Sequence, residues 1–153
     1  MLVKLVLFLD TVQLIIRKLK RRQLLVWRKK RFQLRISQFF FQIWDTPVPQ
    51  DRTVLDAIYK EANIIFLVYT KESSTFIEVR DFWYKRVAEK ARNKPVIFLV
   101  KSKCDKDTKN DLSNDEMEFL ASSGIQFQLV SAKDNLKIDD LFRTAGREFL
   151  KKK

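Results

Sequence analysis

The side chains of this sequence that could do chemistry are amines, carboxylates and hydroxyls in two polar loops. Lys103 and Asp105 follow one apolar run, and Ser131, Ala132 and Lys133 follow another. A carboxylate accepts hydrogen bonds at two oxygens, while a lysine or a serine supplies donors. Such loops can hold a polar ligand through several hydrogen bonds. Each pattern taken singly is also what an ordinary solvated loop looks like.

The composition excludes other kinds of site. The 153 residues include no histidine and a single cysteine, Cys104. Internal disulfides, metal sites built from several cysteines, and Ser-His-Asp catalysis are therefore excluded. Residues 2–9 are apolar except for Lys4, and the run is too short to span a membrane. We expect one domain, residues 1–153, in a cytoplasmic protein that is soluble or peripheral to membranes.

The two loops need a scaffold that brings them together. From Ala62 onward, apolar runs of strand length alternate with helical patterns, an order that builds an α/β fold of three layers. In this fold a mostly parallel sheet has helices on both faces, and the carboxyl ends of its strands meet at one edge. The predicted strands cover residues 63–69, 95–100 and 126–130, and the predicted helices cover residues 76–91, 113–121 and 138–149.

Local signals support two of the predicted helix ends. Ser113 followed by Glu116 predicts a capping box, in which each residue bonds the backbone of the other. Gly124 is placed to end the same helix in a left-handed conformation. These signals therefore fix the helix that follows the loop with Asp105.

The amino-terminal part follows a less regular pattern. Strands are predicted for residues 4–8 and 39–44 and a helix for residues 12–20, but apolar residues between Arg17 and Arg35 follow no clean period. Residues 1–43 carry +10 of the net charge of +12. Such asymmetry is typical of a segment that binds nucleic acid or an anionic membrane, or of one that does not fold against the rest.

Four blocks stand in order along the chain: Gln-Ile-Trp-Asp-Thr at 42–46, Phe-Leu-Val-Tyr at 66–69, Val-Lys-Ser-Lys-Cys-Asp at 100–105 and Ser-Ala-Lys at 131–133. In this order and at nearly the right separations, they resemble the Rab-type small GTPases of the Ras superfamily. The family has Q-I-W-D-T-A-G-Q-E-R, N-K-C-D and S-A-K at the first, third and fourth blocks. The resemblance runs from about Gln42 to the end and implies a small G-domain of the P-loop NTPase type.

The resemblance implies a guanine-binding role for the two polar loops. The Asp105 carboxylate would accept the ring N–H and the exocyclic amine of guanine, and the stem of Lys103 would lie against the base. The backbone N–H of Ala132 would donate to the guanine carbonyl, with Ser131 and Lys133 holding the loop. The implied ligands are GTP and GDP with Mg²⁺, and the implied partners are effector or regulator proteins of vesicle traffic or signalling.

The phosphate side departs from the family. A phosphate loop has the pattern G-x-x-x-x-G-K-S/T, but residues 9–16 read Leu-Asp-Thr-Val-Gln-Leu-Ile-Ile, and no glycine precedes Gly124. Thr11 is the one hydroxyl there that could bind magnesium. The family's D-T-A-G has become Asp-Thr-Pro-Val, which leaves Asp45 as the magnesium-linked carboxylate. Gln50 aligns with the water-orienting glutamine only after an inserted residue.

These departures have a cost in affinity. Losing some four charge-assisted hydrogen bonds to phosphate, at roughly 1.5 to 3 kcal/mol each, weakens binding by about 6 to 12 kcal/mol, or at least four decades. We therefore expect the chain to bind nucleotide weakly or not at all, without efficient hydrolysis.

Several alternatives stay open. One is a nucleotide-free scaffold that binds protein partners, and another is a nucleic-acid or anionic-membrane binder acting through the basic segment from Arg17 to Arg35. A frameshift in the coding DNA would also explain why residues 10–40 replace the phosphate loop and the first switch. The sequence has no cysteine near Lys153, so no prenyl anchor is expected.

Overall fold

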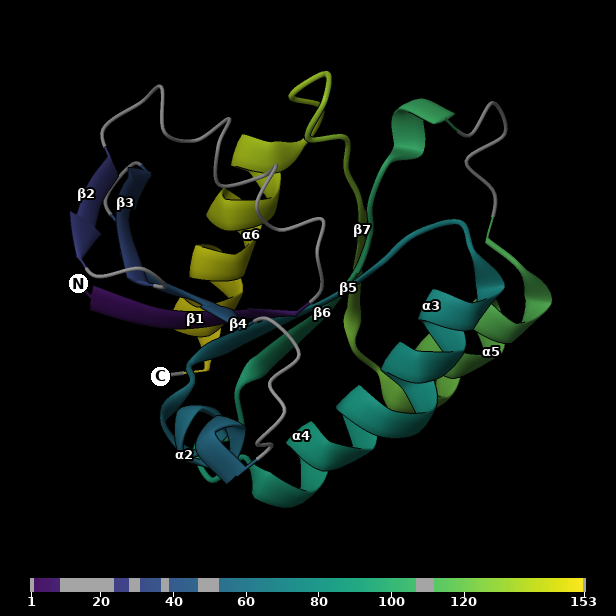
Figure 1. Cartoon of the computed structure of the whole chain (residues 1–153), viewed down its shortest axis with the longest axis horizontal. Helices are drawn as coiled ribbons and strands as arrows, with labels where there is room; N and C mark the ends of the chain where they lie inside the picture. The colour runs from purple at the N-terminus through teal and green to yellow at the C-terminus, as the bar shows by residue number, and fades with distance from the viewer. Residues whose placement is uncertain are drawn as a thin grey trace.

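The structure is a computed structural model that describes residues 2–8, 24–27, 31–36, 39–46, 53–106 and 112–152. A seven-stranded sheet lies at its centre, with helices on both faces (Figure 1). The strands are β1 (Leu2–Phe8), β2 (Leu24–Trp27), β3 (Arg31–Ile36), β4 (Phe39–Thr46), β5 (Ile64–Tyr69), β6 (Val96–Lys101) and β7 (Gln126–Leu129). The helical elements are α2 (Thr53–Glu61), α3 (Ser73–Glu78), the π-helical η2 (Val79–Tyr84), α4 (Lys85–Lys90), the 3₁₀ turn η3 (Cys104–Lys106), α5 (Asn114–Ser123) and α6 (Ile138–Lys151).

The strand order is β2-β3-β4-β1-β5-β6-β7. The five strands from β4 to β7 in this order run parallel. Strand β3 is antiparallel to β4, and β2 is antiparallel to β3. Phe66 pairs with Phe98, and Phe98 pairs with Gln126. The carboxyl ends of β5, β6 and β7 therefore lie at one edge of the sheet, as the sequence predicts.

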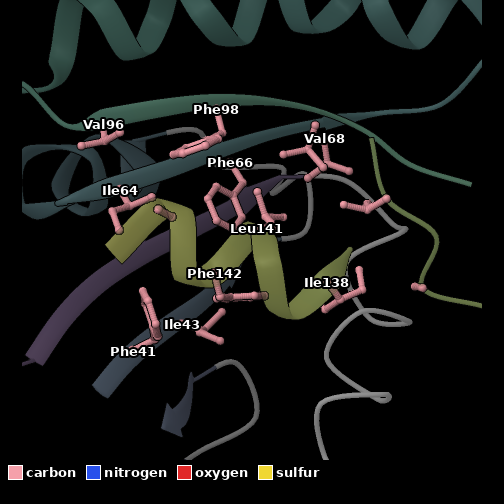
Figure 2. Packing of buried hydrophobic residues seen from close by; sticks show 14 residues of the cluster. Phe41, Ile43, Ile64, Phe66, Val68, Val96, Phe98, Ile138, Leu141 and Phe142 are labelled. Carbon is pink, nitrogen blue, oxygen red and sulfur yellow. The ribbon is translucent and has the colours of Figure 1, made fainter. Parts of the chain in front are cut away.

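The sheet is buried on both faces because its apolar residues alternate between two clusters. Ile64, Phe66 and Val68 of β5 belong to a cluster that includes α6, while the intervening residues of β5 belong to a cluster with α2, α3, α4 and α5. Figure 2 shows the first cluster, in which Phe142 of α6 lies between Phe66 and Phe41. Its ring is 5.4 Å from that of Phe41 and 5.5 Å from that of Phe66, both edge to face. The predicted three-layer fold is confirmed.

The helix predicted over residues 76–91 is present as three consecutive elements, α3, η2 and α4. Phe76, Val79, Trp83 and Val87 are buried, as their spacing predicts. The π-helical stretch was not predicted, because apolar spacing of three and four residues does not distinguish an α-helix from a local π turn. Across this stretch the Trp83 indole N–H donates to Glu78 Oε1 at 3.1 Å.

The predicted ends of α5 are confirmed. Ser113 Oγ accepts the Glu116 N–H at 3.2 Å, and the Ser113 N–H donates to Glu116 Oε2 at 2.6 Å, which is the capping box. Gly124 follows the helix with φ +63°, the left-handed conformation that glycine adopts without strain. The orientation of Glu116 is thereby fixed at the start of α5.

The amino-terminal strands β1 and β4 confirm two predictions, but three neighbouring elements were not predicted. Within the basic segment, β2 and β3 form a hairpin-like antiparallel pair beside β4. Residues 31–36 alternate polar and apolar residues strictly, a strand signal that the mixed composition of the longer segment obscures. Helix α2 was also missed, and its Asp56 forms an ion pair with Arg86 at 2.8 Å. The helix predicted for residues 12–20 lies outside the described residues.

Replacing Phe142 with alanine should destabilise the fold by about 3 to 5 kcal/mol, because a fully buried ring is removed from between two aromatic neighbours. Urea unfolding measures the loss. Leu150→Ala is the matched control, since Leu150 is on the same helix but 40% exposed. Equal losses in the two variants would contradict the packing described for α6.

Candidate functional site

The two polar loops lie side by side where β6 and β7 end, at the top of the view in Figure 1. Three backbone hydrogen bonds hold them there. The Val130 N–H donates to the Lys101 carbonyl at 2.9 Å, and the Cys104 N–H donates to the Val130 carbonyl at 3.2 Å. The Ser102 N–H donates to the Tyr69 carbonyl at 2.8 Å, which attaches the first loop to β5 as well.

Asp105 lies at the centre of this arrangement. Its side chain is 7% exposed, and its Oδ1 accepts a hydrogen bond from Ser131 Oγ at 2.6 Å. Lys133 Nζ lies 3.9 Å from Oδ2, and this lysine is 72% exposed. Ser131 Oγ also accepts the Asp134 N–H at 3.2 Å, so it orders its own loop while it contacts the other. The structure thus brings Asp105, Ser131 and Lys133 together.

Lys103 and Ala132 complete the set of predicted base-side residues. Lys103 is exposed and has φ +60°, a left-handed conformation that costs a lysine roughly 1 to 2 kcal/mol. Ala132 is buried, and no acceptor among the described residues takes its backbone N–H. That N–H is thus a donor that a ligand in the loop could use.

Ser102 stands where the family has asparagine. It is buried, and its Oγ donates to the same Tyr69 carbonyl as its backbone N–H, at 3.0 Å. The short side chain therefore braces the loop against β5 by a contact within its reach.

Lys101 and Glu116 form a buried ion pair that sequence reasoning missed. Lys101 Nζ lies 3.2 Å from each carboxylate oxygen of Glu116. Burial alone would raise the pKa of Glu116, but the nearby Tyr69 hydroxyl, the Ser113 N–H and the positive charge of Lys101 together hold this pKa below its ordinary value. The available signal was the alternation along β6, which places Lys101 on a buried face where an amine needs a counter-charge.

The predicted phosphate-side residues are not assembled by the described part of the structure. Asp45 lies in β4, paired through its backbone with Leu7 of β1. Thr11 and Gln50 lie outside the described residues. Within the described ranges, no group of three histidine, cysteine or acidic side chains is arranged to hold a metal ion. The roles of Asp45, Thr11 and Gln50 thus stay predictions.

A membrane-spanning helix is not found either. Among the helices that the structure describes, none is long and apolar enough to cross a bilayer.

Removing the Ser131 hydroxyl should destabilise the chain by about 1.5 to 3 kcal/mol, because a partly buried hydrogen bond to a carboxylate is lost. Urea unfolding of Ser131→Ala measures this change. Ser122→Ala is the control, because the Ser122 hydroxyl bonds the Phe119 carbonyl from an exposed position. If both serines cost the same, the hydroxyl at 131 contributes no special bond to Asp105.

Glu116 should stabilise the fold only while it is ionised. Because its pKa in the folded chain is below the ordinary 4.5, its contribution is complete above about pH 4.5 and is lost as the pH falls through the folded pKa. The free energy of unfolding should therefore be higher for the native chain than for Glu116→Gln at pH 7, and the difference should shrink below pH 4.5.

Urea unfolding over this pH range measures the difference, with Glu118→Gln as the control because Glu118 is exposed on the same helix. A difference that does not change with pH would contradict an ionised, paired Glu116.

Comparisons with known proteins cover both loops. The sequence pattern of the Ras family matches residues 25–151. GTP-binding protein ypt2 of Schizosaccharomyces pombe is 34% identical over 115 residues, which cover 73% of this chain and 57% of that protein. Ras-related protein Rab-8A of Gallus gallus is 38% identical over 111 residues, covering 70% and 53%. Ras-related protein Rab-12 of Mus musculus is 32% identical over 127 residues, covering 80% and 52%.

The chain spans about half the length of the curated relatives it matches. The matched region extends from β2 to α6 and includes most of the sheet, the helices on both faces and the loops that carry Asp105 and Ser131. The family match and the three-layer parallel fold agree with each other. This chain therefore belongs to the Ras family and is a Rab-like small GTPase in sequence and fold.

Proposed function

We propose that this chain binds guanine nucleotides through the loops that carry Asp105 and Ala132. The observation that supports this most is the Asp105 carboxylate, which is nearly buried and held by Ser131 Oγ at 2.6 Å. A carboxylate fixed in this way is preorganised, so a ligand that binds it loses little freedom in ordering the site. Asp105 is thus the residue on which base recognition depends.

Guanine is the base that fits these groups. Its ring N–H and exocyclic amine are adjacent donors, and one carboxylate can accept from both. The Ala132 N–H has no acceptor among the described residues and would donate to the guanine carbonyl. The apolar stem of exposed Lys103 would cover one face of the ring. Adenine presents an acceptor where guanine presents the ring N–H, so it would be rejected.

The phosphate side supports binding without efficient turnover. No glycine precedes Gly124, and residues 9–16 lack the lysine and the paired glycines of a phosphate loop. Magnesium would depend on Asp45 and Thr11, and hydrolysis on Gln50. We propose that the chain holds nucleotide mainly by its base and takes part, with effector or regulator proteins, in vesicle traffic or signalling.

A titration with fluorescent GDP and GTP, with and without magnesium, tests this function. Asp105→Asn should weaken binding by about a hundredfold, because two hydrogen bonds to a carboxylate are lost at roughly 1.5 kcal/mol each. Asp140→Asn, which changes an exposed carboxylate on α6, should bind like the native chain. Thermal unfolding of each variant shows whether it is folded.

Xanthosine diphosphate tests directly whether Asp105 recognises the base. Xanthine carries a carbonyl where guanine carries the amine, and the amide of asparagine can donate to it. Asp105→Asn should therefore prefer the xanthine nucleotide over the guanine nucleotide, whereas the native chain should show the reverse order. An unchanged preference would exclude Asp105 as the base-reading group.

The glycine-free amino-terminal part favours a second candidate, a nucleotide-free scaffold that binds protein partners. In that case neither the native chain nor Asp105→Asn would bind nucleotide, although both would be folded. Binding through the basic segment from Arg17 to Arg35 would instead be insensitive to the base and would collapse with added salt.

A further inference from the structure

A buried ion pair joins the two ends of the chain segment that contains Asp105. Lys101 is the last residue of β6, and Glu116 lies in the first turn of α5, 15 positions later. The side chains are 8% and 6% exposed, and the amine lies 3.2 Å from both carboxylate oxygens. The ion pair therefore connects the end of β6 to the start of α5.

The location of the pair follows from the sheet. Ile97 and Leu99 of β6 pack into the cluster that also contains Phe119 of α5, and Lys101 continues the same alternation. An amine on this face is removed from water and destabilises the fold unless a carboxylate faces it. Glu116 is held in place to do so by the capping box with Ser113.

The backbone of Lys101 supports the base-side loops directly. Its carbonyl accepts the Val130 N–H at 2.9 Å, just before Ser131. The next residue, Ser102, bonds the Tyr69 carbonyl through both its N–H and its Oγ. A movement of Lys101 would therefore disturb both loops near Asp105.

Room for such a movement exists beside the pair. A cavity of about 470 Å³ is lined by Lys101 and Glu116 together with Thr70, Phe76 and Ser113, among others. If the carboxylate lost its charge, the Lys101 amine could turn through this space toward water. The end of β6 would then lose the ion pair that ties it to the start of α5.

We propose that the Lys101–Glu116 pair is a positioning device that holds the end of β6 so that Asp105 meets Ser131. This inference deepens the proposed guanine recognition and rests on it for its functional meaning. Lys101 and Glu116 are positioning residues that need not touch the base. They act through the backbone of Lys101 and Ser102.

Hydrogen exchange in the nucleotide-free chain tests the proposal. The reporter amides are those of Ser102 and Cys104, and the reference amides are those of Ala91 and Val96, which bond Val87 and Asn63 away from the loops. Glu116→Gln should raise exchange at the reporters by about tenfold or more relative to the references. Glu118→Gln, with its exposed side chain, should change neither group.

A double variant separates positioning from mere stability. In Lys101→Met with Glu116→Gln, both charges are gone, and the unfolding midpoint should return close to the native value because no unpaired charge is buried. The hydrogen-exchange rates of Ser102 and Cys104 should nevertheless stay raised, because the ion pair between β6 and α5 is still absent. If the double variant restores the native exchange together with the midpoint, the pair is structural only and the proposal is overturned. Exchange that rises equally at the reference amides would overturn it too.

The same variants also separate this inference from the proposed function. Affinity for fluorescent GDP should fall by about tenfold in both the single and the double variant. If the native chain binds no nucleotide, the proposed function fails, while the exchange rates still decide whether the pair positions the loop.

Discussion

Both faces of the β5–β6 strand pair are covered, and this burial governs where polar chemistry can occur in the described part of the chain. Every side chain of β5 is buried, and those of β6 are buried or nearly so. Side chains at interior positions of these strands must therefore be apolar, or must have a hydrogen-bond or ion-pair partner. The polar residues emerge where the strands end, and three such ends meet at one edge. The geometry of the loops around Asp105 is a consequence of that edge.

The sequence predicted those parts of the fold in which burial imposes a regular spacing of apolar residues or a recognisable helix cap. The strands around Phe66 and Phe98, the helix faces of Trp83 and Phe142, and the cap at Ser113 all follow from such patterns. Strands β2 and β3 were missed because the arginines and lysines that flank β2 and the arginines within β3 hide the apolar residues among them. Helix α2 was missed because its nine residues are too few to show a clear helical spacing of apolar residues. The π turn was missed because its apolar spacing resembles that of an α-helix.

The sequence indicated which residues of the candidate site lie close together, but not which contacts hold the two loops in place. Asp105 and Ser131 stand in recognisable blocks, and the structure brings them into contact. Ser102 and Lys101 could not be assigned a partner from sequence, because their contacts are with Tyr69 and Glu116, which lie far along the chain. Partners across a sheet depend on register, and register is known only once the strands are placed.

The base side and the phosphate side rest on different parts of the chain. The two core clusters use residues from Phe41 onward, and they position the loops of Asp105 and Ser131. The family's phosphate loop corresponds to residues 9–16, which lie outside the described residues. The proposed roles on the base side thus follow from described contacts, whereas those on the phosphate side follow from the sequence alone.

The sheet ends at both sides on its shortest described strands, β2 and β7, with four residues each. An edge strand exposes unpaired backbone groups that can recruit another chain, and a short edge offers few of them. Arginine and lysine flank β2, and glutamines alternate along β7. A sheet whose middle is almost entirely apolar is thus bounded by short edges, which offer few unpaired backbone groups to a strand of another chain.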